Sequence, residues 1–80
     1  MRVEVSYFAA LRDHAAKSRE KLEIESEQTA RELYIKLQEI YGFPLSFRQL
    51  RVAVNDDFAP LDSPLKEGDH VVFIPPVAGG

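Results

Sequence analysis

Apolar and polar residues alternate at the beginning of the chain, over residues 2–8. A period of two predicts a strand with one buried face. The alternation returns over residues 21–25, where Leu22 and Ile24 stand between charged residues, and it predicts a second strand. The acidic residues of segment 20–27 are interpreted as a solvated edge of that strand. Residues 9–17 are rich in alanine and predict one or two short helical turns.

A repeat of three and four residues follows and predicts the main helix. Thr29 and Glu32 have the spacing of a capping box, in which hydroxyl and carboxylate satisfy backbone donors at a helix start. Gly42, followed by Pro44, ends the repeat. The repeat forms an apolar stripe, expected to lie against a sheet, that consists of Ala30, Leu33, Tyr34, Leu37, Ile40 and Tyr41.

Shorter strands are predicted in the second half of the chain. A loop precedes a third strand at residues 51–55, and the polar residues 55–57 favour a turn before a short return strand that starts at Phe58. A second turn at residues 66–69 leads into the apolar run 71–74, a pattern typical of a central strand covered on both faces. The following diproline cannot donate to a sheet and ends this strand.

The order of these elements indicates an α+β fold. Two strands, a long helix and further strands, with the last one central, describe a mixed sheet with one main helix packed across one face. This is the ubiquitin-like β-grasp arrangement, in which the final strand lies beside the first and the segment between requires a crossover. We expect one β-grasp domain over residues 1–76 and a flexible C-terminal tail over residues 77–80.

Composition narrows the class of protein. Eighty residues, 45% hydrophobic and 29% charged, suit one small globular domain. The chain has no cysteine, so neither a disulfide nor a thiolate metal site is expected, and the cytoplasm is the predicted compartment. A net charge of -3 with scattered basic residues argues against nucleic acid as a binding partner. No apolar stretch approaches the roughly 20 residues that cross a bilayer, so no membrane span is predicted.

Residues that commonly carry catalysis are sparse. The two histidines, His14 and His70, have no ligand-like spacing and are interpreted as surface or partly packed side chains. The pairs Asp56-Asp57 and Asp62-Ser63 stand where turns are needed, so backbone capping is their predicted role. No glycine-rich phosphate loop is present. We therefore assign no metal and no permanently bound cofactor.

The C-terminal tail is the unusual feature of the sequence. The rigid pair Pro75-Pro76 is followed by Val77, Ala78, Gly79 and Gly80. In extended form residues 77–80 span roughly 13 Å, enough to reach a buried pocket of another protein. Glycine lets the backbone pass a narrow channel in any conformation that the partner requires. The alternative interpretation is a frayed terminus or a cloning remnant.

Several segments together resemble the small, sulfur-carrier subunits of molybdopterin synthase. They are residues 7–13 (YFAALRD), 54–55 (VN), 64–69 (PLKEGD) and 73–80 (FIPPVAGG). The last segment is the most specific, because it joins an apolar strand to Pro-Pro-Val, one small residue and a terminal Gly-Gly. The resemblance covers the whole chain, and it implies the β-grasp fold.

The resemblance also implies a reaction cycle centred on Gly80. An ATP-dependent activating enzyme adenylates the terminal carboxylate, so AMP is carried transiently, and a sulfur donor protein converts it to a thiocarboxylate. The large synthase subunit then takes up the tail, and the sulfur passes to a pterin precursor in molybdenum cofactor biosynthesis. The chain would not be an enzyme on its own but a sulfur-donor subunit, in an assembly of two large and two small subunits.

The chemistry of the residues is compatible with this cycle. A free carboxylate is a poor electrophile and needs activation before sulfur can displace oxygen. Because the chain lacks cysteine, the Gly80 carboxyl group is the remaining place for carried sulfur.

Contacts with the large subunit are carried over from the family to Phe8 and Ile74, and with a weaker motif match to Phe58. These three residues could instead belong to the core. Other functions also stay open: a carrier for thiazole (thiamine) or another thiolated product, a protein modifier joined to lysines through Gly80, or an interaction domain with an inert tail.

Overall fold

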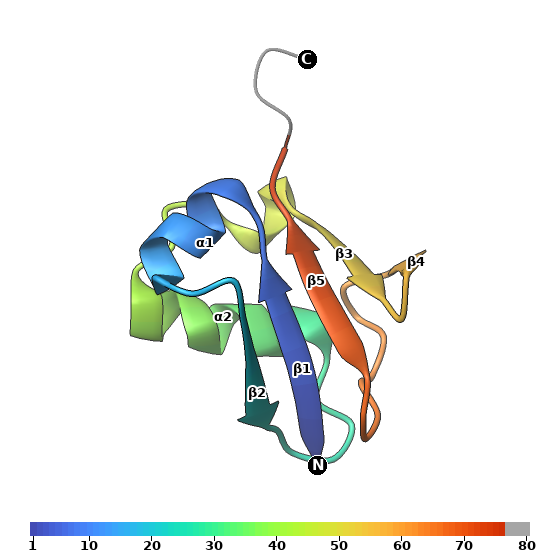
Figure 1. Ribbon diagram of the computed structural model, residues 1–80. Helices are drawn as coiled ribbons and strands as arrows, with labels where there is room; N and C mark the ends of the chain where they lie inside the picture. Colours follow the sequence, from blue (N-terminus) through green and yellow to red (C-terminus); the bar gives the residue numbers. More distant parts are fainter. Residues whose placement is uncertain (77–80) are drawn as a thin grey trace.

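The computed structural model describes residues 1–76, in which a five-stranded sheet carries its main helix on one face (Figure 1). The elements follow in the order β1 (Arg2–Tyr7), α1 (Ala9–Ala15), β2 (Arg19–Glu23), α2 (Ala30–Tyr41), the 3-10 helix η1 (Phe47–Gln49), β3 (Arg51–Val54), β4 (Asp57–Ala59) and β5 (His70–Ile74). None of the helices in this part of the chain has the length and apolar character needed to cross a membrane.

The strand order confirms the predicted β-grasp. Across the sheet the strands lie in the order β2-β1-β5-β3-β4, so the last strand is central and lies beside the first. β1 and β5 are parallel, with Tyr7 opposite Phe73, and the other neighbours are antiparallel. Because β1 and β5 point the same way, both end at the side of the sheet opposite the N-terminus (Figure 1). The chain therefore reaches Pro75 and Pro76 from the middle of the sheet.

The helix α2 begins and ends where its capping residues predict. Thr29 Oγ1 accepts a hydrogen bond from the Glu32 backbone N–H at 3.1 Å, and Glu32 Oε1 accepts one from the Thr29 N–H at 2.9 Å. Gly42 ends the helix at φ 71°, a left-handed conformation that glycine adopts at little cost. The prediction was wrong for Ile40, which is 64% exposed. Ile40 lies at the margin of the apolar stripe and is exposed, whereas its neighbour Tyr41 in the same turn packs against the core.

The core lies between α2 and one face of the sheet. Alternate residues of β1 and β5 point into it, as the period of two requires. Tyr34 is fully buried, and its hydroxyl donates to the Leu45 carbonyl at 2.7 Å. Tyr34 also stacks on Phe43, with 5.6 Å between ring centroids. The fully buried large side chains are Tyr7, Tyr34, Phe73, Leu11, Leu33, Leu37, Val3, Val5, Val52 and Val71.

One predicted feature of β5 was wrong. The apolar run over residues 71–74 predicted burial on both faces, but Val72 and Ile74 are only half-buried. The two α-helices, α1 and α2, lie on the same side of the sheet, so no helix within residues 1–76 covers the opposite face (Figure 1). β5 thus carries apolar side chains on a face that the described part of the chain leaves uncovered.

The interpretation of segment 20–27 as a solvated edge was wrong for Glu20. β2 runs over residues 19–23 instead of 21–25, and Glu20 points to the core side, opposite Val5. Glu20 Oε2 accepts hydrogen bonds from the hydroxyls of Tyr7 and Tyr41, each at 2.6 Å. Burial alone would raise the Glu20 pKa, but these hydrogen bonds and nearby Lys17 outweigh it, and the pKa is lowered. Glu20 therefore ties β1, β2 and α2 together.

The predicted turns are present and are fixed by polar contacts. Asn55 and Asp56 have φ of 53° and 74°, the pair of positive values that a tight hairpin turn between β3 and β4 requires. Asp69 is buried, and it accepts hydrogen bonds from Asn55 Nδ2 at 2.9 Å and from the Lys66 N–H at 2.8 Å. The two turns thereby hold each other in place at the start of β5.

Candidate functional site

The uncovered face of the sheet contains the predicted contact residues. In β5, Val72 and Ile74 alternate with the core residues and therefore point to this face. Register places Ala53 opposite Val72 and Phe58 opposite Ala53, so Phe58 points to the same side. Sheet pairing thus places Phe58 of the β4 edge on the same face as the central strand.

Phe8, Phe58 and Ile74 are not core residues. Phe8 is 51% exposed and Phe58 is 69% exposed, whereas Ile74 is half-buried. Phe8 stands between β1 and α1 in extended conformation, with φ -119° and ψ 150°. The alternation of β1, which points Tyr7 into the core, directs Phe8 away from it. The structure therefore removes the alternative in which these three side chains fill the core.

Two grooves meet at residues 74–76, directly before the predicted tail. The larger has a volume of about 550 Å³ and an almost wholly apolar lining, formed by Phe8, Ala9, Ala10, Leu45, Ile74, Pro75 and Pro76. The smaller has a volume of about 280 Å³ and is lined by Gln49, Arg51, Phe58, Ile74, Pro75 and Pro76. Residues 74–76 line both grooves, and we call the two grooves with this shared segment the tail-base surface. It brings together Phe8, Phe58, Ile74, Pro75 and Pro76, all predicted from the sequence.

The remaining predicted site residues lie outside the described part of the chain. These are Val77, Ala78, Gly79 and Gly80, and the predicted tail over residues 77–80 therefore stays a prediction. The structure specifies where that segment starts. Pro76 follows Pro75 directly after the central strand, next to exposed apolar side chains. Leu45 and Arg51 also line the grooves and were not predicted as site residues. For Arg51, the only available signal was the alternation of β3, which places its side chain on the face opposite the core.

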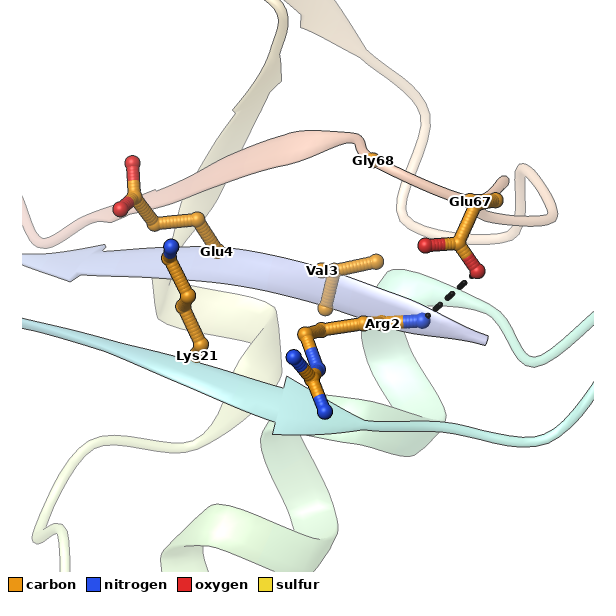
Figure 2. Close-up of a pocket in the computed structure, with 6 residues that line it drawn as sticks. All are labelled: Arg2, Val3, Glu4, Lys21, Glu67 and Gly68. Carbon is orange, nitrogen blue, oxygen red and sulfur yellow. Dashed lines mark hydrogen bonds between the residues drawn. The ribbon is translucent and has the colours of Figure 1, made fainter.

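The opposite end of the sheet has a polar groove of a different kind. Its volume is about 360 Å³, and Figure 2 shows side chains of both charges around it, among them Arg2, Glu4, Lys21 and Glu67. Glu67 Oε1 accepts a hydrogen bond from the Arg2 backbone N–H at 3.1 Å. Opposite charges alternate along this groove, so it favours neither an anion nor a cation.

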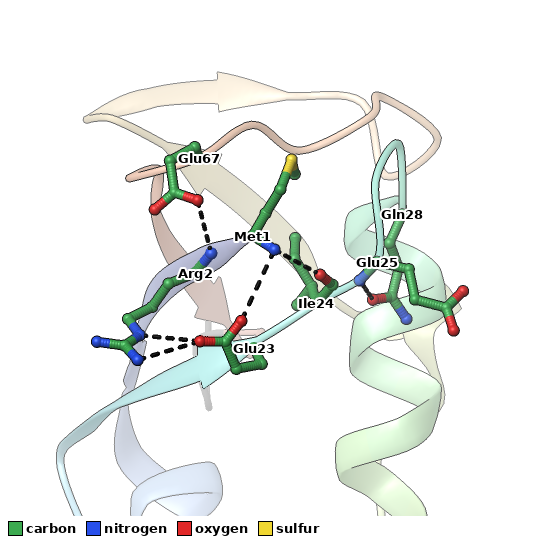
Figure 3. A network of polar contacts seen from close by, with 7 residues as sticks. All are labelled: Met1, Arg2, Glu23, Ile24, Glu25, Gln28 and Glu67. Atoms are coloured by element: carbon green, nitrogen blue, oxygen red, sulfur yellow. Dashed lines mark hydrogen bonds and ion pairs between the residues drawn. The ribbon is translucent and has the colours of Figure 1, made fainter.

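Polar contacts next to this groove fix the first residues of the chain. The terminal ammonium of Met1 donates to the Ile24 carbonyl at 3.0 Å and lies 3.7 Å from Glu23 Oε2 (Figure 3). Arg2 Nε donates to Glu23 Oε1 at 3.2 Å. These contacts hold β1 against β2 at the end of the sheet remote from Pro75 and Pro76.

The histidines have structural surroundings. His14 is exposed, and its Nδ1 lies 2.9 Å from the Ala10 carbonyl within α1. His70 is partly exposed, and its Nε2 lies 2.8 Å from Ser6 Oγ. Both positions agree with the interpretation as surface or partly packed side chains. Within residues 1–76, no group of three or more His, Cys, Asp or Glu side chains is arranged to hold a metal ion.

Comparison with known proteins gives matches along nearly the whole chain. The ThiS family matches residues 5–80. The molybdopterin synthase sulfur carrier subunit of Mycobacterium tuberculosis is 38% identical over 82 aligned positions, which cover all of this chain and 99% of that protein. The resemblance seen in the sequence motifs is thereby confirmed.

Solved structures agree with this assignment. A chain in the complex of subunits 1 and 2 of molybdopterin-converting factor from Helicobacter pylori matches with a TM-score of 0.69 and 31% identity, over 100% of both chains. A ubiquitin-like protein from the archaeon Caldiarchaeum subterraneum matches with a TM-score of 0.59 over 99% of this chain and 100% of that one; at 15% identity it shows the fold alone. The chain belongs to the ThiS family and has its fold in the ubiquitin-like β-grasp class.

Proposed function

We propose that this chain is the sulfur carrier subunit of molybdopterin synthase and that it acts in the cytoplasm. The observation that carries the proposal is the match to the Mycobacterium tuberculosis sulfur carrier subunit over the whole chain, which includes the Gly-Gly end. In this function Gly80 is the working residue and residues 77–79 carry it into the partner. The chain is then a sulfur-donor subunit, and the catalytic side chains belong to the large subunit.

The chemistry at Gly80 proceeds in two steps. The Gly80 carboxylate attacks the α-phosphate of ATP on an activating enzyme, which gives an acyl-adenylate and releases pyrophosphate. The outer sulfur of a persulfide on a sulfur donor protein then displaces AMP, and a thiol of that protein attacks the donor's sulfur in the resulting acyl disulfide, which releases the terminus as a thiocarboxylate and leaves the donor protein as a disulfide. The chain has no cysteine, so carried sulfur is attached at the terminal carboxyl group. ATP is thus consumed on the partner, and no resident cofactor is required in this chain.

The tail-base surface supports docking on the large subunit. Exposed aromatic and apolar side chains that gather around one segment are typical of protein interfaces. Phe8 and Ile74 line the larger groove, and Phe58 lines the smaller one. Docking here would direct the residues after Pro76 into the partner. We propose an assembly of two small and two large subunits.

Reconstitution tests this function. The purified chain is incubated with ATP, the activating enzyme and the sulfur donor of its own organism, repurified, and mixed with the large subunit and the cyclic pterin precursor. We expect conversion of the precursor by the sulfur-loaded chain and none by the chain incubated without ATP. Conversion that does not depend on prior loading would overturn the proposal.

The loading experiment and an examination of cell lysates together separate the proposed function from its alternatives. A carrier for thiazole or another thiolated product would load with sulfur but fail to convert the pterin precursor. A protein modifier would instead appear in lysates as a conjugate linked from Gly80 to a lysine. An interaction domain with an inert tail would accept no sulfur at all.

A further inference from the structure

The smaller groove of the tail-base surface contains a cation, Arg51, whose position the proposed function does not explain. Arg51 belongs to β3 and lies opposite Ile74 of β5 in the sheet register. Its guanidinium carbon lies 5.9 Å from the centroid of the Phe58 ring. Alternation along β3 and the Ala53–Phe58 pairing place Arg51 and Phe58 on the same face. Arg51 therefore places a positive charge next to Phe58, on a surface that is mainly apolar.

Arg51 has no acidic partner within residues 1–76. Two of the other arginines in this part of the chain form ion pairs, Arg2 with Glu23 at 3.1 Å and Arg31 with Asp62 at 2.8 Å, whereas the remaining ones, like Arg51, form none. No Asp or Glu of residues 1–76 lies within 4.0 Å of the Arg51 guanidinium. The aromatic ring orients the guanidinium but leaves its N–H donors available.

Docking would change the surroundings of this charge. A partner that covers Phe58 and Ile74 also removes water from Arg51, because all three line the same groove. A guanidinium that loses water without gaining an anion is strongly destabilising, whereas a carboxylate matches its planar fork of donors. Arginine is enriched at interface centres for this reason.

We propose that Arg51 determines which partner docks on the tail-base surface, by requiring an Asp or Glu carboxylate of the large subunit beside an apolar contact. The proposal rests on the proposed function and adds the chemistry that the partner must present. The apolar residues contribute contact area that many surfaces could match. The charge gives selectivity, because a partner with a neutral or basic side chain at that point leaves the guanidinium unpaired.

Arg48 offers a matched control. It is exposed, it lies on η1 with its guanidinium carbon 5.7 Å from the Phe47 ring centroid, and it forms no ion pair within residues 1–76. Arg48 does not line either groove of the tail-base surface. A substitution there changes the net charge of the chain by the same amount as one at Arg51, without touching the proposed contact.

The test is calorimetric titration of the full chain with the large subunit, at low and high salt. We expect Arg51→Glu to raise the Kd by about tenfold or more, and Arg51→Gln to raise it less and to reduce the salt dependence. We expect Arg48→Glu to change the Kd by about twofold at most. Melting curves check that each variant is folded, and Arg51→Gln, which introduces no opposite charge, is the second variant if Arg51→Glu melts early.

A second arm reverses the charges. If the inference holds, one Asp→Arg or Glu→Arg change in the large subunit restores the binding of Arg51→Glu. Binding of Arg51→Glu and Arg51→Gln at the strength of the Arg48→Glu control would overturn the role of Arg51 while leaving the proposed function intact. Failure of the unaltered chain to bind the large subunit would instead overturn the proposed function, and this inference with it.

Discussion

Replacing Glu20 by glutamine should destabilise the fold without touching the tail-base surface. The carboxylate accepts two hydroxyl hydrogen bonds of 2.6 Å, from Tyr7 and Tyr41. Hydrogen bonds to a charged group contribute about 1.5 to 3 kcal/mol each, and neutral ones about 0.5 to 1.5 kcal/mol. Glutamine keeps an acceptor oxygen but loses the charge, so each bond weakens by about 1 kcal/mol. Because Tyr41 is partly exposed, water can replace part of its hydrogen bond, so we expect the free energy of unfolding to fall by about 1.5 to 2 kcal/mol in total.

Thermal and guanidinium unfolding at neutral pH measure this loss. For a domain of this size, 1 kcal/mol corresponds to a Tm change of about 4 to 8 °C, so we expect Glu20→Gln to lower the Tm by roughly 6 to 16 °C. Glu39→Gln is the control, because Glu39 is exposed on α2 and its side chain forms no hydrogen bond or ion pair within residues 1–76. If the two variants melt together, the Glu20 contacts do not stabilise the fold.

The same contacts predict how stability depends on pH. The folded state lowers the Glu20 pKa, so the unfolded chain binds a proton at Glu20 more readily than the folded one. The stability from this group is present above the ordinary glutamate pKa and is lost as the pH falls through the lowered folded value. The stability difference between the unaltered chain and Glu20→Gln should therefore shrink on acidification. A difference that grows toward acid would contradict the lowered pKa.

Three further predictions concern the helix, the surface and the tail. Thr29→Ala should lower the unfolding free energy by about 1 kcal/mol through loss of the capping box, with sulfur loading of the folded fraction unchanged in a mass assay. Phe8→Ala and Ile74→Asp should weaken binding to the large subunit in titrations, while Ile40→Ala, a change at an exposed apolar residue of α2 outside the tail-base surface, should not. Unfolding of both Phe8→Ala and Ile74→Asp would contradict the surface role. Deletion of Gly80 should leave the Tm unchanged, because the described core lies within residues 3–73. It should nevertheless reduce ATP-dependent sulfur loading by about a hundredfold or more, since the new terminal carboxylate, on Gly79, ends roughly 3.5 Å short of the position that the Gly80 carboxylate would reach in the partner.

Local patterns predicted most of the fold, because they act over a few residues. The Thr29 and Glu32 pair and Gly42 gave the limits of α2, and alternation gave β1. The sequence could not show whether one or both faces of β5 are buried. A continuous apolar run has two explanations, a second covering layer or an exposed contact surface, and the sequence of the run is the same in both.

Contacts between distant segments were the ones that sequence patterns missed. Glu20 stands among acidic residues, and only the pairing of β1 with β2 shows that it meets Tyr7 and Tyr41. Arg51 gains its position from a register that joins three strands. The short helix η1 was predicted as loop, since three residues are too few for any period to be recognised.

The intact mass of the protein isolated from its native cells shows whether Gly80 carries sulfur. We expect a second species, heavier by the difference between one sulfur and one oxygen atom, with the change confined to the C-terminal peptide after digestion. This species should disappear in cells that lack the activating enzyme. A single species with an unmodified terminus, in cells that are actively making molybdenum cofactor, would contradict the carrier function.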